Sequence, residues 1–134
     1  MSRLRIVLVD DNTAVLDQAS RVLEGRYDIV GKLNEGNTVV KDCLRLKPDV
    51  VVLDISLGEV SGIDLARELR DSGSRSKIVF LTVHEDYDFV NAALGAGALA
   101  YVVKSRLGAD LASGVEAAMA EKLFVSPNLL YQQN

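Results

Sequence analysis

The chain alternates short, nearly continuous apolar runs with segments in which apolar residues recur at intervals of three and four. Such runs are typical of strands buried on both faces, and the longer interval is typical of amphipathic helices. Strands are predicted at residues 6–9, 27–33, 50–53, 78–81 and 101–103, each followed by a helical segment. Five strand–helix units in succession predict an α/β fold with a parallel sheet.

Local signals place the ends of the predicted helices. Asn12 is expected to cap the first helix and Gly25 to end it, and Ser61 is expected to cap the third. The second helix is expected from about Thr38 to Leu46, before Pro48. The fourth is expected to close at Gly95 and Gly97, and the fifth to carry the apolar stripe of residues 111–119.

A polar residue follows four of the predicted strands: Asp10 and Asp11, Asp54, Thr82, and Lys104. The carboxyl ends of parallel strands share one edge of a sheet, so these side chains are expected to converge there. Clustered carboxylates suit Mg²⁺, and a carboxylate can act as a nucleophile toward phosphorus while a hydroxyl and an ammonium hold phosphoryl oxygens. Each residue also has an ordinary explanation as a turn, cap or solvated end, but the set would then be a coincidence of four.

These residues, together with Gly62-Ile63-Asp64-Leu65 and the segment 96–101, resemble the receiver domain of two-component response regulators. The residues 83–85 and 103–105 look most like the NarL/LuxR branch, whose receivers precede a helix-turn-helix domain. The resemblance implies a five-stranded parallel sheet in the order 2-1-3-4-5 with helices on both faces, a doubly wound, flavodoxin-like fold. It also implies a phosphoacceptor with at most slow self-dephosphorylation rather than an enzyme.

The resemblance further implies a role for each site residue. Asp54 would accept a phosphoryl group from a sensor histidine kinase or a small phosphodonor. Thr82 and Lys104 would bind the phosphoryl oxygens, and Tyr101 would turn inward as Thr82 moves. The Mg²⁺ ligands would be Asp11 and Asp54 directly, Asp10 through water, and the backbone carbonyl of Ser56. The surface of the fourth helix, fifth strand and fifth helix, or another helical face, would form a homodimer.

Two departures from the family pattern stand out, and two further residues are candidates for tuning the site. Gly58-Glu59 replaces a common Pro-Gly step, so the loop after Asp54 is expected to be more mobile or differently shaped. Ser105 follows Lys104 where many receivers have a cis proline, so a trans bond is expected. Ser56 and His84 border the path of an attacking water in receivers, which makes them candidate modulators of dephosphorylation, although His84 also fits an exposed loop residue.

Charge and composition narrow the setting. The net charge is -4 and there is no run of Lys and Arg, so this segment is not expected to contact nucleic acid. A single cysteine, Cys43, lies in an apolar helical pattern and is expected to be buried and inert. No apolar stretch approaches the ~18 residues of a membrane span, so a soluble, cytoplasmic protein is expected.

The predicted domain division places the receiver at 1–122 and a tail, or the start of a linker, at 123–134. A DNA-binding domain beyond the chain would then carry transcriptional output, by analogy alone. Three alternatives are open. A phosphatase would need an acidic residue at position 56, which is Ser. A nucleotide carrier would need a phosphate-binding loop in place of residues 10–12. A stand-alone or phosphorylation-independent binding module of the same fold is compatible with the altered loop.

Overall fold

Six strands form the main sheet of the computed structural model, which describes residues 3–130. They are β1 (Arg5–Val9), β2 (Asp28–Leu33), β3 (Val50–Leu53), β6 (Lys77–Thr82), β7 (Ala100–Val103) and β8 (Phe124–Val125). Their spatial order is β2-β1-β3-β6-β7-β8, and every neighbouring pair is parallel. The first five in this order give the predicted 2-1-3-4-5 topology, which is therefore confirmed.

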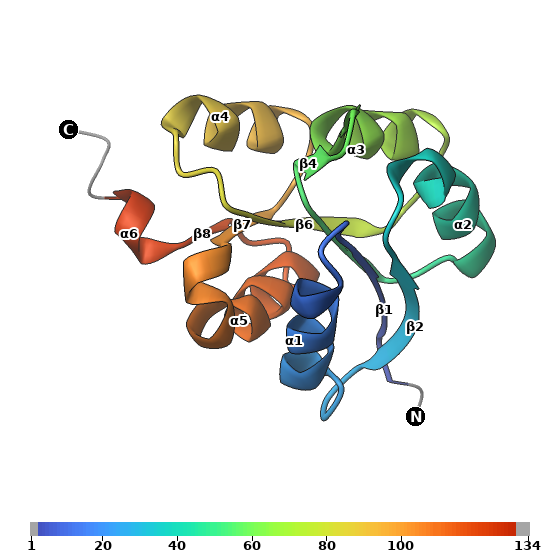
Figure 1. Cartoon of the computed structure of the whole chain (residues 1–134), viewed down its shortest axis with the longest axis horizontal. Helices are drawn as coiled ribbons and strands as arrows, with labels where there is room; N and C mark the ends of the chain where they lie inside the picture. Colours follow the sequence, from blue (N-terminus) through green and yellow to red (C-terminus); the bar gives the residue numbers. More distant parts are fainter. Residues whose placement is uncertain (1–2, 131–134) are drawn as a thin grey trace.

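Helices cover both faces of this sheet (Figure 1). They are α1 (Thr13–Leu23), α2 (Val39–Leu46), α3 (Gly62–Asp71), α4 (Tyr87–Gly95), α5 (Leu107–Met119) and the short α6 (Pro127–Leu130), with 3₁₀ turns η1 (Gly36–Thr38) and η2 (Lys104–Arg106). One buried cluster joins α1 and α5 to one face of the sheet, and a second joins α2, α3 and α4 to the other. The molecule is thus the predicted three-layer α/β structure.

Alternation along the strands explains how one sheet serves two cores. In β3, Val50 and Val52 belong to the cluster under α1 and α5, whereas Val51 and Leu53 belong to the cluster under α2, α3 and α4. Successive side chains of a strand point to opposite faces, so a strand buried on both sides must be apolar throughout. The first polar side chain, Asp54, therefore appears only where the strand ends.

The predicted caps are present. The Asn12 side chain accepts hydrogen bonds from the backbone N–H groups of Ala14 and Val15, and Ser61 accepts one from Asp64. Helix α1 ends slightly before the predicted Gly25, because Glu24 is the C-cap residue. These caps matter for the site, because α1 begins shortly after Asp10 and Asp11, and α3 begins directly after the β4–β5 hairpin that follows Asp54.

The loop after Asp54 forms a small hairpin. Strands β4 (Ser56–Leu57) and β5 (Val60–Ser61) pair antiparallel around a two-residue turn in which Gly58 has φ 62°. A glycine with positive φ at the first turn position is a hairpin signal. Leu57 is buried in the core. The structure thus gives this loop a defined hairpin shape.

The sequence did not predict β8 or α6. Phe124–Val125 extends the sheet beyond β7, and α6 follows it, with Leu129 fully buried. These elements fall in the segment 123–134, for which the sequence predicts a tail or the start of a linker. Residues 131–134 of this segment lie outside the described residues. The boundary at residue 122 stays a prediction.

Candidate functional site

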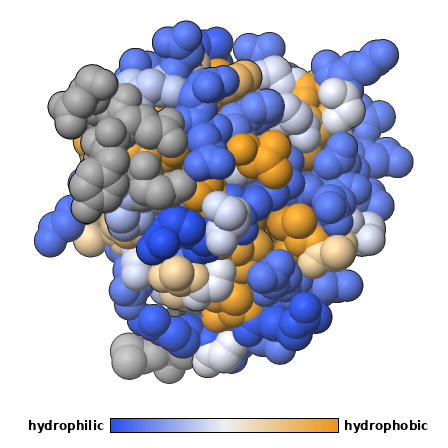
Figure 2. Space-filling view, turned by 60° about the vertical axis from the view of Figure 1, so that its left-hand side comes forward, coloured by the Kyte–Doolittle hydropathy of each residue, from blue (hydrophilic) through white to orange (hydrophobic). Residues whose placement is uncertain are grey.

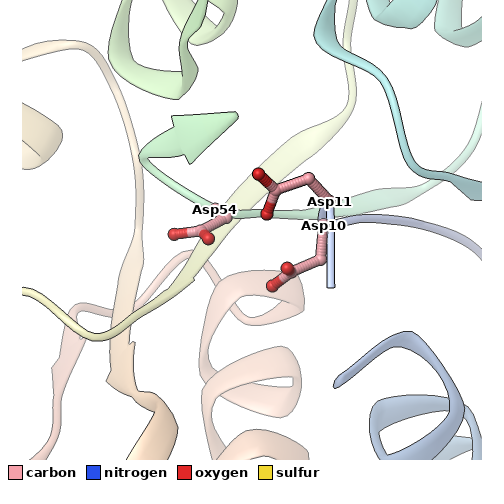
Figure 3. Close-up of side chains that lie close together, drawn as sticks. All are labelled: Asp10, Asp11 and Asp54. Atoms are coloured by element: carbon pink, nitrogen blue, oxygen red, sulfur yellow. The ribbon is translucent and has the colours of Figure 1, made fainter. Parts of the chain in front are cut away.

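Three aspartates meet at the carboxyl edge of the sheet (Figure 3). Asp10 and Asp11 follow β1 and Asp54 follows β3; Asp10 donates its backbone N–H to Leu33 and Asp54 donates its own to Val9. One carboxylate oxygen from each of the three lies within 4.8 Å of those of the other two. The predicted convergence of the acidic residues is therefore present.

Burial raises the free-energy cost of keeping these carboxylates charged. Asp10 is 2% exposed and Asp54 is 4% exposed, whereas Asp11 is exposed. The pKa of Asp10 is raised, chiefly by burial and also by the charge of Asp54, although hydrogen bonds from Lys104 and the Asn12 backbone oppose the shift. Two buried like charges repel each other, and a neighbouring cation offsets this repulsion.

Lys104 supplies that charge. Its Nζ lies 2.8 Å from Asp10 Oδ2 and donates a hydrogen bond to Asp54 Oδ2 at 2.9 Å. Burial alone would lower the pKa of Lys104, but its hydrogen bonds to the two carboxylates outweigh burial, and the pKa is raised. The lysine is thus a charged bridge between the ends of β1 and β3, delivered from the end of β7.

The residues present fit a hard divalent cation. Asp54 Oδ1 is buried and has no hydrogen-bond partner among the described residues. An unpartnered buried carboxylate oxygen carries a desolvation cost that a cation would remove. All the donors in the cluster are oxygens, as Mg²⁺ requires, so the acidic pocket is of the right chemistry for it.

Thr82 ends β6 at the same edge. It is fully buried and sits opposite Val103 in the register of β6 with β7, so Thr82 and Lys104 end neighbouring strands. Its hydroxyl oxygen accepts a hydrogen bond from the backbone N–H of His84 at 3.3 Å. The hydroxyl proton is left to donate elsewhere.

Tyr101 lies inside the molecule. Its ring is fully buried and its hydroxyl donates a hydrogen bond to the backbone carbonyl of His84 at 2.7 Å. Burial, together with the negative charges of Asp54, Asp86 and Glu85, raises the pKa of Tyr101, so the phenol is neutral. The ring therefore lies inward in this structure, and the expected turn of Tyr101 with Thr82 stays a prediction.

Ser56 and His84 meet beside the pocket. Ser56 Oγ and His84 Nε2 are joined by a hydrogen bond of 2.8 Å, and the His84 ring stacks on Phe89 at a centroid distance of 4.1 Å. The sequence placed both residues near the site but gave no sign that they contact each other. The contact ties the β4–β5 hairpin to the start of α4.

Two backbone features fix the loops that hold the site. The Lys104–Ser105 bond is trans, as expected. A Cβ at Gly62 would lie 1.9 Å from the carbonyl oxygen of Asp54, so no other residue fits there without moving the backbone of Asp54. In the sequence, Gly62 stands out only as part of the motif Gly62-Ile63-Asp64-Leu65, since a close approach between residues 54 and 62 has no local signal.

Fold and site together define a receiver. Residues 6–116 match the response regulator receiver domain family, and the chain belongs to that family. It is therefore a phosphoacceptor domain rather than a catalytic enzyme, with the acidic pocket of Asp10, Asp11 and Asp54.

Its relatives include transcriptional regulators. The response regulator GacA of Pseudomonas viridiflava is 30% identical over 131 residues, covering 96% of this chain and 61% of that protein. The transcriptional regulatory protein LiaR of Bacillus subtilis (strain 168) is 32% identical over 117 residues, covering 86% and 56%. The chain thus spans roughly 56–61% of these curated relatives.

Solved structures of response regulators have the same fold as this chain. A crystal structure of a two-component response regulator of the LuxR family from Aurantimonas sp. SI85-9A1 superposes with a TM-score of 0.90 at 31% identity, covering 97% of this chain and 94% of that one. The isolated receiver of RcsB from Salmonella enterica serovar Typhimurium, at 20% identity and a TM-score of 0.89, shares the fold. The predicted likeness to the NarL/LuxR branch is confirmed. Within the described residues, no helix has the length and apolar character of a membrane span.

Proposed function

We propose that Asp54 accepts a phosphoryl group and that the acquired charge switches the surface of the domain. The observation that carries the proposal is the position of Lys104. Its ammonium contacts both Asp10 and Asp54 at the sheet edge where β6 ends with Thr82. A nucleophilic carboxylate, a fixed cation and a hydroxyl in one pocket are the parts that phosphoryl transfer needs.

The metal would be Mg²⁺, held by Asp10, Asp11, Asp54 and the backbone carbonyl of Ser56. Bound there, it would neutralise carboxylate charge and orient the phosphoryl oxygens. The unpartnered Asp54 Oδ1 and the three clustered carboxylates support this assignment.

In the transfer step, an Asp54 carboxylate oxygen attacks phosphorus and forms a P–O bond. The bond from phosphorus to the donor breaks: the P–N bond of a phosphohistidine, whose ring keeps the electron pair and takes a proton, or the P–O bond of a small acyl phosphate, which leaves as carboxylate. Lys104 then pairs with the phosphoryl oxygens instead of two bare carboxylates, and Thr82 donates its hydroxyl proton to them.

The switch would follow from this new set of contacts. Movement of the Thr82 hydroxyl breaks its bond with the His84 N–H, and His84 also accepts the bond from Tyr101. The loop between β6 and α4 therefore has two links to the site. A dianionic adduct would redistribute them and change the faces of α4, β7 and α5.

The partners follow from the family. A sensor histidine kinase would supply the phosphoryl group in the cytoplasm, and a DNA-binding domain outside this chain would carry transcriptional output, since the chain itself has a net charge of -4. A homodimer would use the helices α4 and α5 that flank β7, or another helical face, because β8 already occupies the free edge of β7.

Intact mass after incubation with acetyl phosphate and Mg²⁺ tests the proposal. We expect a single phosphoryl adduct in the wild type, none in Asp54→Asn, and an unchanged adduct in the matched control Asp64→Asn, because Asp64 is exposed on α3. Repeated absence of an adduct in the folded wild type would favour a binding module that works without phosphorylation, and steady phosphate release over many equivalents would favour a phosphatase.

A further inference from the structure

The segment 124–130 is joined to the strand that delivers Lys104. In the parallel pairing of β8 with β7, Phe124 lies opposite Ala100 and Val125 opposite Tyr101. The N–H of Phe124 donates to the carbonyl of Leu99, and the N–H of Ser126 donates to the carbonyl of Tyr101, both at 2.9 Å. The segment is therefore an added edge strand, not a loose continuation.

Ser126 extends this contact toward the site. It is fully buried, and its Oγ accepts a hydrogen bond of 3.1 Å from the backbone N–H of Val103. Strand β8 ends at Val125, so the serine hydroxyl takes the place that a strand carbonyl would have for this last N–H of β7. Buried N–H groups need such a partner. The next residue is Lys104.

Leu129 holds the segment down from its other end. It is fully buried in the same apolar cluster as Tyr101. The segment thus forms hydrogen bonds with two groups of β7, the carbonyl of Tyr101 and the N–H of Val103. Its docking and the geometry of the end of β7 depend on each other.

We propose that Ser126 is a positioning residue for the phosphoryl site, and that the docked segment 124–130 favours the Lys104 position that binds a phosphoryl group. This inference rests on the proposed function. Ser126 does not contact the reacting atoms; it acts through Val103 and Lys104. The receiver unit then extends beyond residue 122 and includes this segment.

Linkage makes the effect reciprocal. A docked segment that favours phosphoryl binding must itself be favoured by phosphoryl binding, by the same factor. The phosphorylated receiver would hold the segment more firmly against β7, and this would fix the direction in which the chain continues. Phosphorylation would then not free the edge of β7 for a second molecule.

The surrounding surface agrees with a segment that belongs to the fold. Figure 2 shows the side of the molecule that lies on the left in Figure 1, and the apolar residues visible there lie in patches between hydrophilic ones. Leu123, 67% exposed just before β8, is one of three large apolar side chains that the described residues leave exposed, and none of the three lies in β8 itself.

The first test compares Ser126→Ala with Ser113→Ala, the same change at an exposed position of α5. Beryllofluoride, a stand-in for the phosphoryl group, is titrated in the presence of saturating Mg²⁺, and Mg²⁺ is titrated separately. We expect Ser126→Ala to weaken beryllofluoride binding about tenfold, within the up to ~100-fold cost of misplacing a positioning group, and not to lower Mg²⁺ affinity, because a displaced Lys104 competes less with the metal for Asp10 and Asp54. Mg²⁺ affinity is the second readout, because general loosening of the fold would lower both affinities.

The second test starts from the wild type. Amide hydrogen exchange of the wild type is measured with Mg²⁺ alone and with Mg²⁺ and beryllofluoride. Slower exchange at Val103, Phe124 and Ser126 when beryllofluoride is bound is the expected result, and Leu129→Ala should abolish this protection. Equal exchange at these amides in the two conditions, or equal beryllofluoride affinity in Ser126→Ala and Ser113→Ala, would overturn the inference.

These outcomes separate the inference from the function on which it rests. A wild type that binds beryllofluoride and takes up phosphate from acetyl phosphate, while Ser126→Ala behaves as Ser113→Ala, removes the role of Ser126 and keeps Asp54 as phosphoacceptor. A folded wild type that does neither removes the proposed function itself.

Discussion

The Tyr101 hydroxyl donates a 2.7 Å hydrogen bond to the backbone carbonyl of His84, across 17 residues of sequence. The ring is fully buried on β7, and His84 lies two residues beyond Thr82 in the loop before α4. This single contact joins the residue proposed as the switch to the loop that a moving Thr82 would displace. Its removal is therefore informative.

Tyr101→Phe should lower the free energy of unfolding by about 0.5–1.5 kcal/mol, because it removes one hydrogen bond and keeps the buried ring. Urea denaturation measures the change. Tyr87→Phe is the matched control, since Tyr87 is half-buried and its hydroxyl makes no hydrogen bond within the described part of the chain. A similar loss in both variants would mean that the His84 contact contributes nothing of its own.

Ser56 and His84 are predicted to act as a pair. Their hydrogen bond and the stacking of His84 on Phe89 hold the imidazole beside the pocket, where it limits the approach of water to the adduct. Ser56→Ala and His84→Ala should each shorten the lifetime of the phosphoryl adduct about 2- to 10-fold, the equivalent of one hydrogen bond. The double variant should be no worse than the more severe single one, because residues in contact are not additive.

Decay of the phosphorylated mass with time measures this lifetime, with Ser113→Ala as control. Longer lifetimes in the two single variants would indicate that His84 activates water instead of limiting its approach.

Lys104 is predicted to stabilise the domain by offsetting the repulsion between two buried negative charges. Lys104→Met should cost roughly 3 kcal/mol in the absence of divalent cations, because it leaves Asp10 and Asp54 buried without a counter-charge. Mg²⁺ should then stabilise the variant more than the wild type, because the ammonium no longer competes with it for the carboxylates.

Thermal denaturation with and without Mg²⁺ measures both effects. Lys122→Met is the control, because Lys122 is exposed in the turn after α5. If Mg²⁺ raises the melting temperature of all three proteins equally, Lys104 does not compete with the metal.

Gly62 should be intolerant of any side chain. Gly62→Ala places a methyl group 1.9 Å from the carbonyl oxygen of Asp54, and overpacking of this kind costs about 1–3 kcal/mol. It should also slow adduct formation, since the backbone that must yield carries the nucleophile. Gly108→Ala is the opposite control: nothing lies within 4 Å of its Cβ, so it should be neutral or stabilise α5 by up to about 1 kcal/mol. Comparable stability of the two variants would contradict the close approach.

The sequence predicted the sheet and the acidic pocket because both follow from local patterns. A strand such as β3, buried on both faces, must be apolar until its last residue, so the polar residue that ends it marks the carboxyl edge. Once several strands are parallel, Asp10, Asp54 and Lys104 meet without further information. The caps Asn12 and Ser61 were predicted for a similar reason, since each bonds within its own first turn.

The remaining features depend on contacts between distant residues. Strand β8 has only two residues, and it exists because the free edge of β7 offers hydrogen bonds to residues 23 or more positions later in the chain. Its sequence neighbours, Ser126 and Pro127, are equally typical of a linker. The Ser56–His84 pair likewise spans 28 positions, so spacing alone could not reveal it.

The lone cysteine gives a pH prediction. The pKa of the Cys43 thiol is raised from its ordinary 9.0 to about 11, mainly by burial in the core under α2 and to a smaller extent by the nearby charge of Asp42. Because the folded state holds this proton more tightly than the unfolded state, the resulting stability is complete below about pH 9 and is lost as the pH rises toward 11. The loss amounts to roughly 2–3 kcal/mol.

Cys43→Ala cannot titrate, so the difference in unfolding free energy between the wild type and this variant should shrink by that amount between pH 8 and pH 11, as measured by urea denaturation under reducing conditions. A constant difference over this range would show that the thiol titrates alike in both states.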